Sequence, residues 1–221
     1  MRQMAERMPL SRVSTVDALV AALRSRILSG DLRPGAHLSE VELATAYGVG
    51  RHSLRAAFRE LARGGLLVHE PNRGVRVPVP TAEESEDLYL HRAALELGAL
   101  HVALADGRSL DGVLGPLAAL REMPEDEPWD RVAVAHDAFH AAIVDAAGGR
   151  RLSAAYAALQ GELLFFVTRI RPLYTVETMI AAHERLADAL VGGDPARAEA
   201  ALALDLAQGR DAIRAALATA G

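Results

Sequence analysis

The chain has 221 residues, of which 51% are hydrophobic, so it is long enough for one large domain or two small ones and can bury a core. It contains no cysteine, which excludes disulfides and thiolate metal sites, and its sequence has no apolar run long enough to span a bilayer. The first ten residues lack the apolar core of a secretory signal, so we expect a cytoplasmic protein with no membrane partner.

The charges divide the chain into two parts. Residues 1–80 carry 12 arginines against 7 acidic residues, a net charge of +5, whereas residues 81–221 carry 12 arginines against 22 acidic residues, a net charge of −10. A basic first part is attracted to nucleic-acid phosphates, and an acidic second part is repelled by them. This split predicts that the two parts have different functions.

The first predicted element is a helix from Thr15 to Ser29, where apolar residues recur at helical spacing and Gly30 follows as a stop. Ser39 and Glu42 have the spacing of a capping box. They predict a second helix that ends near Gly48.

A third helix is predicted over residues 51–63. Its apolar side consists of Leu54, Ala57, Phe58 and Leu61. The opposite side carries a basic stripe of Arg51, Arg55, Arg59 and Arg63. Two strands, 66–70 and 75–79, are predicted around the turn at 71–74. Helix, tight turn, helix and hairpin in this order predict a winged helix-turn-helix, a fold that places its second helix in a DNA groove.

Pro78, Val79 and Pro80 form a stiff junction, and we place a domain boundary there, between residues 1–78 and 81–221. Thr81 and Glu84 predict another capping box, after which the pattern is helical throughout. The predicted helices cover 81–106, 109–122, 128–147, 150–170, 175–192 and 195–219. The predicted fold class is therefore mainly α, with an N-terminal winged helix-turn-helix that includes a small β-hairpin and a C-terminal all-α helical bundle.

The order and spacing of these motifs resemble a GntR-family transcriptional regulator of the FadR subfamily, whose second half is the helical, ligand-binding FCD domain. The resemblance in the first half rests on residues 27–35, 38–44, 48–51, Arg55 and the wing at 71–74. In the second half it rests on Arg92 and Glu96, Phe139 and His140, His183, and Gly193 with Asp194. It implies a homodimeric, ligand-responsive regulator, most often a repressor, that binds a palindromic operator in double-stranded DNA.

The resemblance also implies that the recognition helix enters the major groove and that a wing glycine approaches the minor groove. The residues at the family's contact positions are Gly50, Arg51, His52, Ser53, Arg55 and Gly74. Arginine can bind guanine O6 and N7 with two hydrogen bonds, or clamp a phosphate. The family usually has hydroxyl residues at position 50, Thr at 52, and Pro or Thr at 53, so we expect an operator different from those of close relatives. The alternative is that the basic stripe is an ordinary solvated helix face.

The family's effector domain commonly holds a divalent metal through one Asp and three His. The matching positions here hold His136, His140, His183 and Asp205, with the carboxylate and one imidazole exchanged. Helix geometry agrees, since positions 136 and 140 are about 40° apart on one face. Mixed nitrogen and oxygen ligands suit Zn²⁺, Ni²⁺ or Mn²⁺. Asp137, rotated by about 100°, is expected toward the rim, where it could orient His140 by a hydrogen bond.

In the family, the metal receives the carboxylate of a small organic acid. Arg92 matches the family's arginine on the first helix of the effector domain, and it could hold such a carboxylate with two hydrogen bonds. Its alternative role is a surface ion pair with Glu96, four residues later. Tyr156 and Arg169 are further candidates for binding the effector.

Two other interpretations remain open. In the first, the second half is a metal-free dimerisation domain with a degenerate pocket, where Asp205 pairs with a protonated histidine. In the second, the protein is a metalloenzyme, since His-x-x-x-His with a third His and an Asp in a helical bundle resembles some hydrolytic and oxygen-using sites. We expect no enzyme, because the sequence offers no general base beyond the ligands and catalysis leaves the N-terminal domain unexplained.

Overall fold

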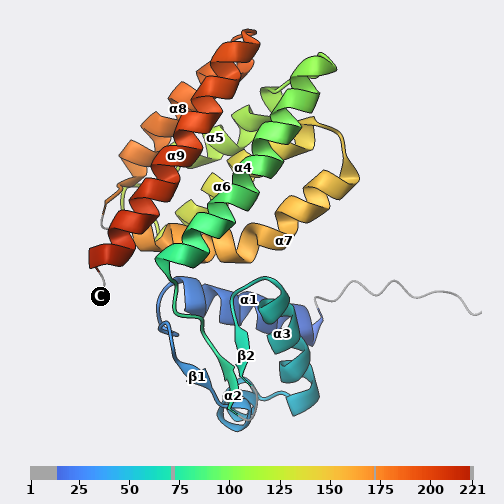
Figure 1. The fold of residues 1–221 in the computed structure, drawn as a ribbon. Helices are drawn as coiled ribbons and strands as arrows, with labels where there is room; N and C mark the ends of the chain where they lie inside the picture. Colours follow the sequence, from blue (N-terminus) through green and yellow to red (C-terminus); the bar gives the residue numbers. More distant parts are fainter. Residues whose placement is uncertain (1–13, 71–72, 172, 220–221) are drawn as a thin grey trace, which may run out of the picture.

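The computed structural model describes residues 14–70, 73–171 and 173–219, which form a small N-terminal unit and a larger helical unit (Figure 1). The N-terminal residues that bear on a secretory signal lie outside the described residues, as do Pro71 and Asn72 of the predicted wing turn. Within the described part, no helix combines the length and hydropathy needed to cross a membrane.

Three helices build the N-terminal unit, and all three match the predictions: α1 (Thr15–Leu28), α2 (Glu40–Tyr47) and α3 (Arg51–Arg63). The Ser39 hydroxyl accepts a hydrogen bond from the Glu42 amide at 3.3 Å, which is one half of the predicted capping box. Gly48 ends α2 in the left-handed region, with φ of 64°. Glycine adopts that conformation without steric cost, so the chain can turn tightly into α3.

The N-terminal unit contains a three-stranded sheet instead of the predicted two-stranded hairpin. The strands β1 (His37–Leu38), β2 (Val68–Glu70) and β3 (Gly74–Arg76) lie in the order β1-β3-β2, and both pairings are antiparallel. β2 and β3 are shorter than expected. β1 was not predicted because two residues are too few to show the alternation that identifies a strand.

The second unit is all helical and agrees with the predicted elements to within a few residues. Its helices are α4 (Ala82–Ala105), α5 (Leu114–Arg121), α6 (Trp129–Ala146), α7 (Arg150–Val167), α8 (Val176–Val191) and α9 (Pro195–Thr219). Short 3₁₀ turns at Asp111–Val113 and Thr168–Ile170 precede α5 and follow α7. The predicted capping box of Thr81 and Glu84 starts α4.

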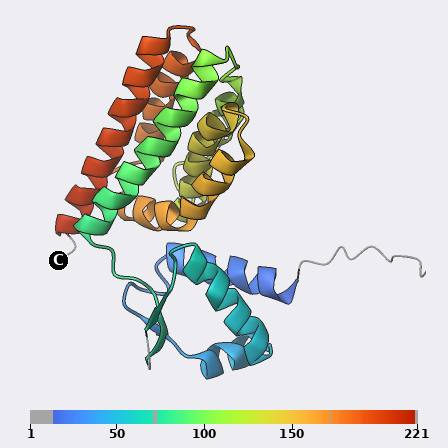
Figure 2. The same cartoon turned by 45° about the vertical axis from the view of Figure 1, so that its right-hand side comes forward.

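The two units share one apolar core. α1 lies along the side of the small unit that faces the helical unit (Figures 1 and 2). A single cluster of buried side chains includes Ile27 of α1 and Phe58 of α3 as well as Phe165 and Phe166 of α7. The predicted boundary falls in the coil between β3 and α4, but this coil is not the only connection. Whether residues 1–78 and 81–221 fold as separate domains stays a prediction.

Candidate metal centre and DNA interface

The N-terminal end of α3 presents the residues predicted to contact DNA. Arg51 and His52 are exposed and Ser53 is half-buried. Gly50 is the N-cap residue and supplies no side-chain hydrogen bond, as expected from the missing hydroxyl. The apolar side of α3 is fully buried, so the helix has one orientation in the unit and its basic side faces outward.

Arg55 differs from the other arginines of the stripe because its Nε donates to the Glu40 carboxylate of α2, at 2.7 Å. Both side chains remain partly exposed, so the pair contributes little to stability. The pair was not predicted, because Glu40 lies 15 residues earlier in the sequence. A base or phosphate that bound Arg55 would have to displace this carboxylate.

The wing glycine lies at the first residue of β3. Gly74 is exposed, pairs with Glu70 of β2, and has φ of +88°. A side chain is strained in that conformation, and nothing lies within 4 Å of the place where its Cβ would be. Another backbone, such as that of DNA, can therefore approach the tip of the hairpin closely.

Three of the four predicted metal ligands come together in the core of the helical unit. His136 and His140 of α6 and His183 of α8 are buried, and each offers a ligand nitrogen within 4.8 Å of the others. The ring of His136 lies 4.8 Å from both other rings. As predicted, His136 and His140 share their face of α6 with buried Val132, Phe139 and Ile143.

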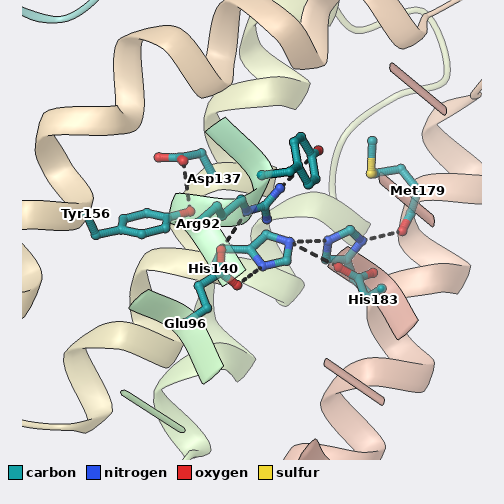
Figure 3. A network of polar contacts seen from close by, with 9 residues as sticks. Arg92, Glu96, Asp137, His140, Tyr156, Met179 and His183 are labelled. Atoms are coloured by element: carbon teal, nitrogen blue, oxygen red, sulfur yellow. Dashed lines mark hydrogen bonds and ion pairs between the residues drawn. The ribbon is translucent and has the colours of Figure 1, made fainter. Parts of the chain in front are cut away.

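The hydrogen bonds of two histidines fix which nitrogen of each ring is free (Figure 3). Nδ1 of His140 lies 2.8 Å from the Glu96 carboxylate, and Nδ1 of His183 lies 2.8 Å from the Met179 carbonyl oxygen. Both oxygens only accept, so each Nδ1 is the donor. In the neutral rings the two Nε2 atoms then carry lone pairs, and these atoms face each other at 3.2 Å.

With both rings neutral, this arrangement fits a metal ion, because the Nε2 acceptors then converge without a donor between them. The Nε2 atoms of His140 and His183 face one another, and Asp205 Oδ2 lies 3.6 Å from the former. Nδ1 of His136 is buried without a hydrogen-bond partner among the described residues. Two nitrogens bound to one Zn²⁺ at 2.0–2.1 Å in tetrahedral geometry are about 3.3 Å apart, close to the observed separation.

The pKa shifts of two histidines also favour metal binding. Burial, together with repulsion from His140, lowers the pKa of His183 to about 4 and moves the pKa of His136 well below its usual value. Both imidazoles are therefore neutral near pH 7. A metal ion needs the neutral form of the ring and does not have to displace a proton here.

Asp205 of α9 lies at the edge of this cluster. Its side chain is 18% exposed, and its nearest histidine contact, at 3.6 Å, is too long for a hydrogen bond. It is not among the side chains whose ligand atoms all lie within 4.8 Å of one another. The structure thus assembles the three imidazoles tightly and places the exchanged carboxylate beside them.

Arg92 and Glu96 form an ion pair, but it is buried rather than on the surface. Nε of Arg92 donates to Glu96 at 2.6 Å, and both side chains are at most 3% exposed. The other Glu96 oxygen accepts from His140, so one carboxylate orients both the predicted ligand-binding arginine and a predicted metal ligand. Burial opposes ionisation of Glu96, yet its pKa is lowered because Arg92 and His140 stabilise the anion.

A small cavity beside the histidines has a volume of about 30 Å³. Its polar lining consists of Tyr89, Arg92, His136, Tyr174, His183, Asp205 and Gln208. Nη1 of Arg92 donates to the Tyr89 hydroxyl at 3.2 Å, whereas Nη2 is buried without a partner among the described residues. Arg92 thus lines the cavity and keeps one donor without a partner among the described residues.

The prediction for Asp137 was wrong in position and in partner. Its side chain is buried, and it accepts hydrogen bonds from the Tyr156 hydroxyl at 3.2 Å and from Gln160 at 2.5 Å. Glu96, not Asp137, orients His140. The prediction placed Asp137 at the rim from its helix angle alone. It failed because α7 covers that side of α6, and the sequence does not show this packing.

The two further effector candidates do not line the cavity. The Tyr156 hydroxyl is bonded to Asp137, near Arg92 (Figure 3). The guanidinium of Arg169 stacks over the Phe165 ring at 4.5 Å. Neither side chain reaches the histidine cluster directly.

Comparison with known families divides the chain in the same way as the fold. The model for "Bacterial regulatory proteins, gntR family" matches residues 15–77, and the FCD domain model matches residues 87–208. The first match covers α1 to β3, with the exposed recognition helix. The second includes the three histidines and Arg92.

Similar proteins that match most of the chain are named as transcriptional regulators. A probable D-xylose utilization operon transcriptional repressor of Paenarthrobacter nicotinovorans is 30% identical over 194 residues, covering 87% of this chain and 86% of the relative. The transcriptional regulator LutR of Bacillus subtilis is 27% identical over 210 residues, covering 85% and 95%. A solved GntR transcriptional regulator from Rhodococcus sp. RHA1 is 28% identical and superposes with a TM-score of 0.75, covering 90% and 97%.

Proposed function

The chain belongs to the GntR family of bacterial regulatory proteins and carries an FCD domain, and from this premise we propose a homodimeric repressor whose operator affinity responds to a small organic acid. It is a transcriptional regulator with a DNA-binding and an effector domain, not an enzyme. Repression is proposed because the Paenarthrobacter relative is named a repressor. We assign DNA binding to residues 1–78 and effector binding to 81–221.

The proposed DNA contacts are those at the free end of α3 and at the wing: Gly50, Arg51, His52, Ser53, Arg55 and Gly74. Support comes from the exposure of this end and from the excess of arginine in the first 80 residues. Each subunit of a dimer would place one recognition helix in a major groove, so the operator is proposed to be a palindrome of two half-sites.

The proposed metal ligands are His136, His140 and His183, with Asp205 as a fourth. The observation that carries this proposal is the convergence of the facing Nε2 atoms of His140 and His183, the Asp205 carboxylate and the unpartnered Nδ1 of His136. A bound Zn²⁺, Ni²⁺ or Mn²⁺ would supply a Lewis-acidic centre for a carboxylate. Glu96 would hold His140 in the orientation that such an ion needs.

Arg92 is the proposed partner of the effector's carboxylate. Arg92 lines the cavity and its Nη2 has no hydrogen-bond partner among the described residues, so the guanidinium has a donor left for an anion. The cavity of about 30 Å³ holds one or two waters, so an acid must displace part of the wall. Tyr174 lies in the connection before α8 rather than in a helix, and it is the wall residue that we expect to move.

Operator titration tests the proposal as a whole. A duplex selected by the wild-type protein from a random-sequence pool is titrated by fluorescence anisotropy at fixed salt, with and without carboxylates of two to six carbons. At least one acid is expected to weaken binding by tenfold or more, a typical allosteric coupling. The Arg92→Lys variant keeps a cation beside Glu96, so it should bind the duplex, but its response to the acid should be weaker because lysine lacks the two-pronged guanidinium. If no acid in the set changes the affinity of the wild type, the acid-sensing proposal fails.

Metal analysis of variants tests the histidine ligands and the carboxylate ligand separately. Wild type purified without chelator is expected to contain about one equivalent of divalent metal. His140→Ala should lower Zn²⁺ affinity by at least tenfold, because it removes a central nitrogen, whereas Asp205→Ala should lower it less. His101→Ala is the control, since His101 is exposed and remote from the cluster. A wild type that binds no added Zn²⁺, Ni²⁺ or Mn²⁺ in calorimetry would leave the metal-free dimer as the better interpretation.

A further inference from the structure

Helix α7 touches the C-terminal end of the recognition helix through backbone atoms. A Cβ added to buried Gly161 of α7 would overlap the carbonyl oxygen of Gly64, the C-cap residue of α3. The next residue, Gly65, has φ of +73°, and a Cβ there would lie 3.0 Å from Cβ of Glu162. The helical unit therefore meets α3 at a point where no side chain can be inserted.

This contact explains why α7 contains a glycine at position 161. Glycine is disfavoured inside a helix because it has the most backbone freedom to lose. Gly98 in α4 and Gly115 in α5 have no atom within 4 Å of a built Cβ, so a methyl group fits at either position. At Gly161, by contrast, a methyl group requires α7 and α3 to move apart.

The residue before Gly161 connects α7 to the helix of the metal ligands. Gln160 donates to Asp137 at 2.5 Å, and Tyr156, one turn earlier, donates to the other oxygen of the same carboxylate. Asp137 lies between His136 and His140 on α6, next to the former in sequence. One buried carboxylate beside the histidines thus holds two residues of α7 against α6.

We propose that Gly161 and Gln160 are positioning residues for DNA binding. Gln160 holds α7 on α6 through Asp137. Gly161 allows the backbone of α7 to contact the C-terminal end of α3. Together the two residues set the orientation of the recognition helix relative to the effector unit. The proposal rests on the proposed function for its consequence at DNA, but the contact itself can be tested without DNA or metal.

The first variant is Gly161→Ala in the full chain, with Gly98→Ala as the matched control. Hydrogen exchange followed by mass spectrometry should show faster exchange in peptides that cover residues 61–67 of Gly161→Ala, by tenfold or more. Zn²⁺ affinity should stay within about twofold of wild type. Affinity for the selected duplex should fall by at least tenfold, since two recognition helices must match the spacing of two half-sites. Gly98→Ala should leave all three measurements unchanged.

The second variant is Gln160→Ala, which removes the bond to Asp137 without adding volume. Its exchange over residues 61–67 and its operator affinity should change in the same direction as in Gly161→Ala, by a smaller factor. It keeps the test valid if Gly161→Ala does not fold.

Unchanged exchange over residues 61–67 in both variants would overturn the proposal. Faster exchange with unchanged operator affinity would overturn the positioning role and leave only a structural contact. If the wild type selects no duplex, the proposed function fails, and the exchange measurement still decides whether the contact holds the end of α3.

Discussion

Replacing Glu96 with alanine is expected to lower the free energy of unfolding by about 3–5 kcal/mol. The reason is that Arg92 keeps its charge in the core and loses the carboxylate that neutralises it. Glu96 also orients His140, so Zn²⁺ affinity should fall by about 10- to 100-fold in whatever fraction folds. Urea denaturation followed by circular dichroism measures the first effect, and calorimetry measures the second.

Glu199→Ala is the matched control, because Glu199 also pairs with a histidine but on the surface. The free energy of unfolding of this control should lie within about 0.5 kcal/mol of the wild-type value. The double variant Arg92→Met with Glu96→Leu should recover most of the stability of wild type, since apolar residues of similar size remove the unpaired charge. A Glu96→Ala protein as stable as the control would show that Arg92 is solvated and that the pair is not buried.

The Arg51→Ala variant is expected to bind the selected duplex at least about 30-fold more weakly than wild type. A two-pronged contact to guanine is worth about 1–3 kcal/mol, and a dimer loses it at both half-sites, for a total of about 2–6 kcal/mol. Stability should not change, because Arg51 is exposed. Anisotropy at constant salt, with thermal unfolding alongside, separates the two effects.

Arg63→Ala provides the control, since Arg63 is exposed on the same helix but about 18 Å from its N-terminal end. Its loss of affinity should be much smaller. If the two variants weaken binding equally, the basic stripe acts as a general phosphate-attracting surface, and the assignment of base contacts to the start of α3 is wrong. A selection repeated with Arg51→Ala should then return the same sequence as wild type.

The helices could be predicted because their signals are local. Apolar spacing, capping hydroxyls and terminal glycines placed α1 to α3 to within about one residue, and Gly48 ends α2 where expected. β1 was not predicted, because its two residues form a strand only by pairing with β3. A strand that short has no pattern of its own.

In the candidate site, helix periodicity could indicate which residues point inward but not what they meet. It correctly predicted that His136, His140 and His183 share the core. It could not show that Glu96 reaches both Arg92 and His140, since the latter lies 44 residues away, or that α7 covers Asp137. These contacts depend on the packing of three helices.

The core shared by α1, α3 and α7 bears on how such a regulator can be rebuilt. Exchange of an effector half between relatives would join apolar surfaces that were never fitted to each other. A chimera made by cutting only at the coil before α4 would carry mismatched partners for Ile27, Phe58 and Phe165. A biosensor with a new ligand specificity is therefore better obtained by changing the walls of the small cavity than by grafting a foreign domain.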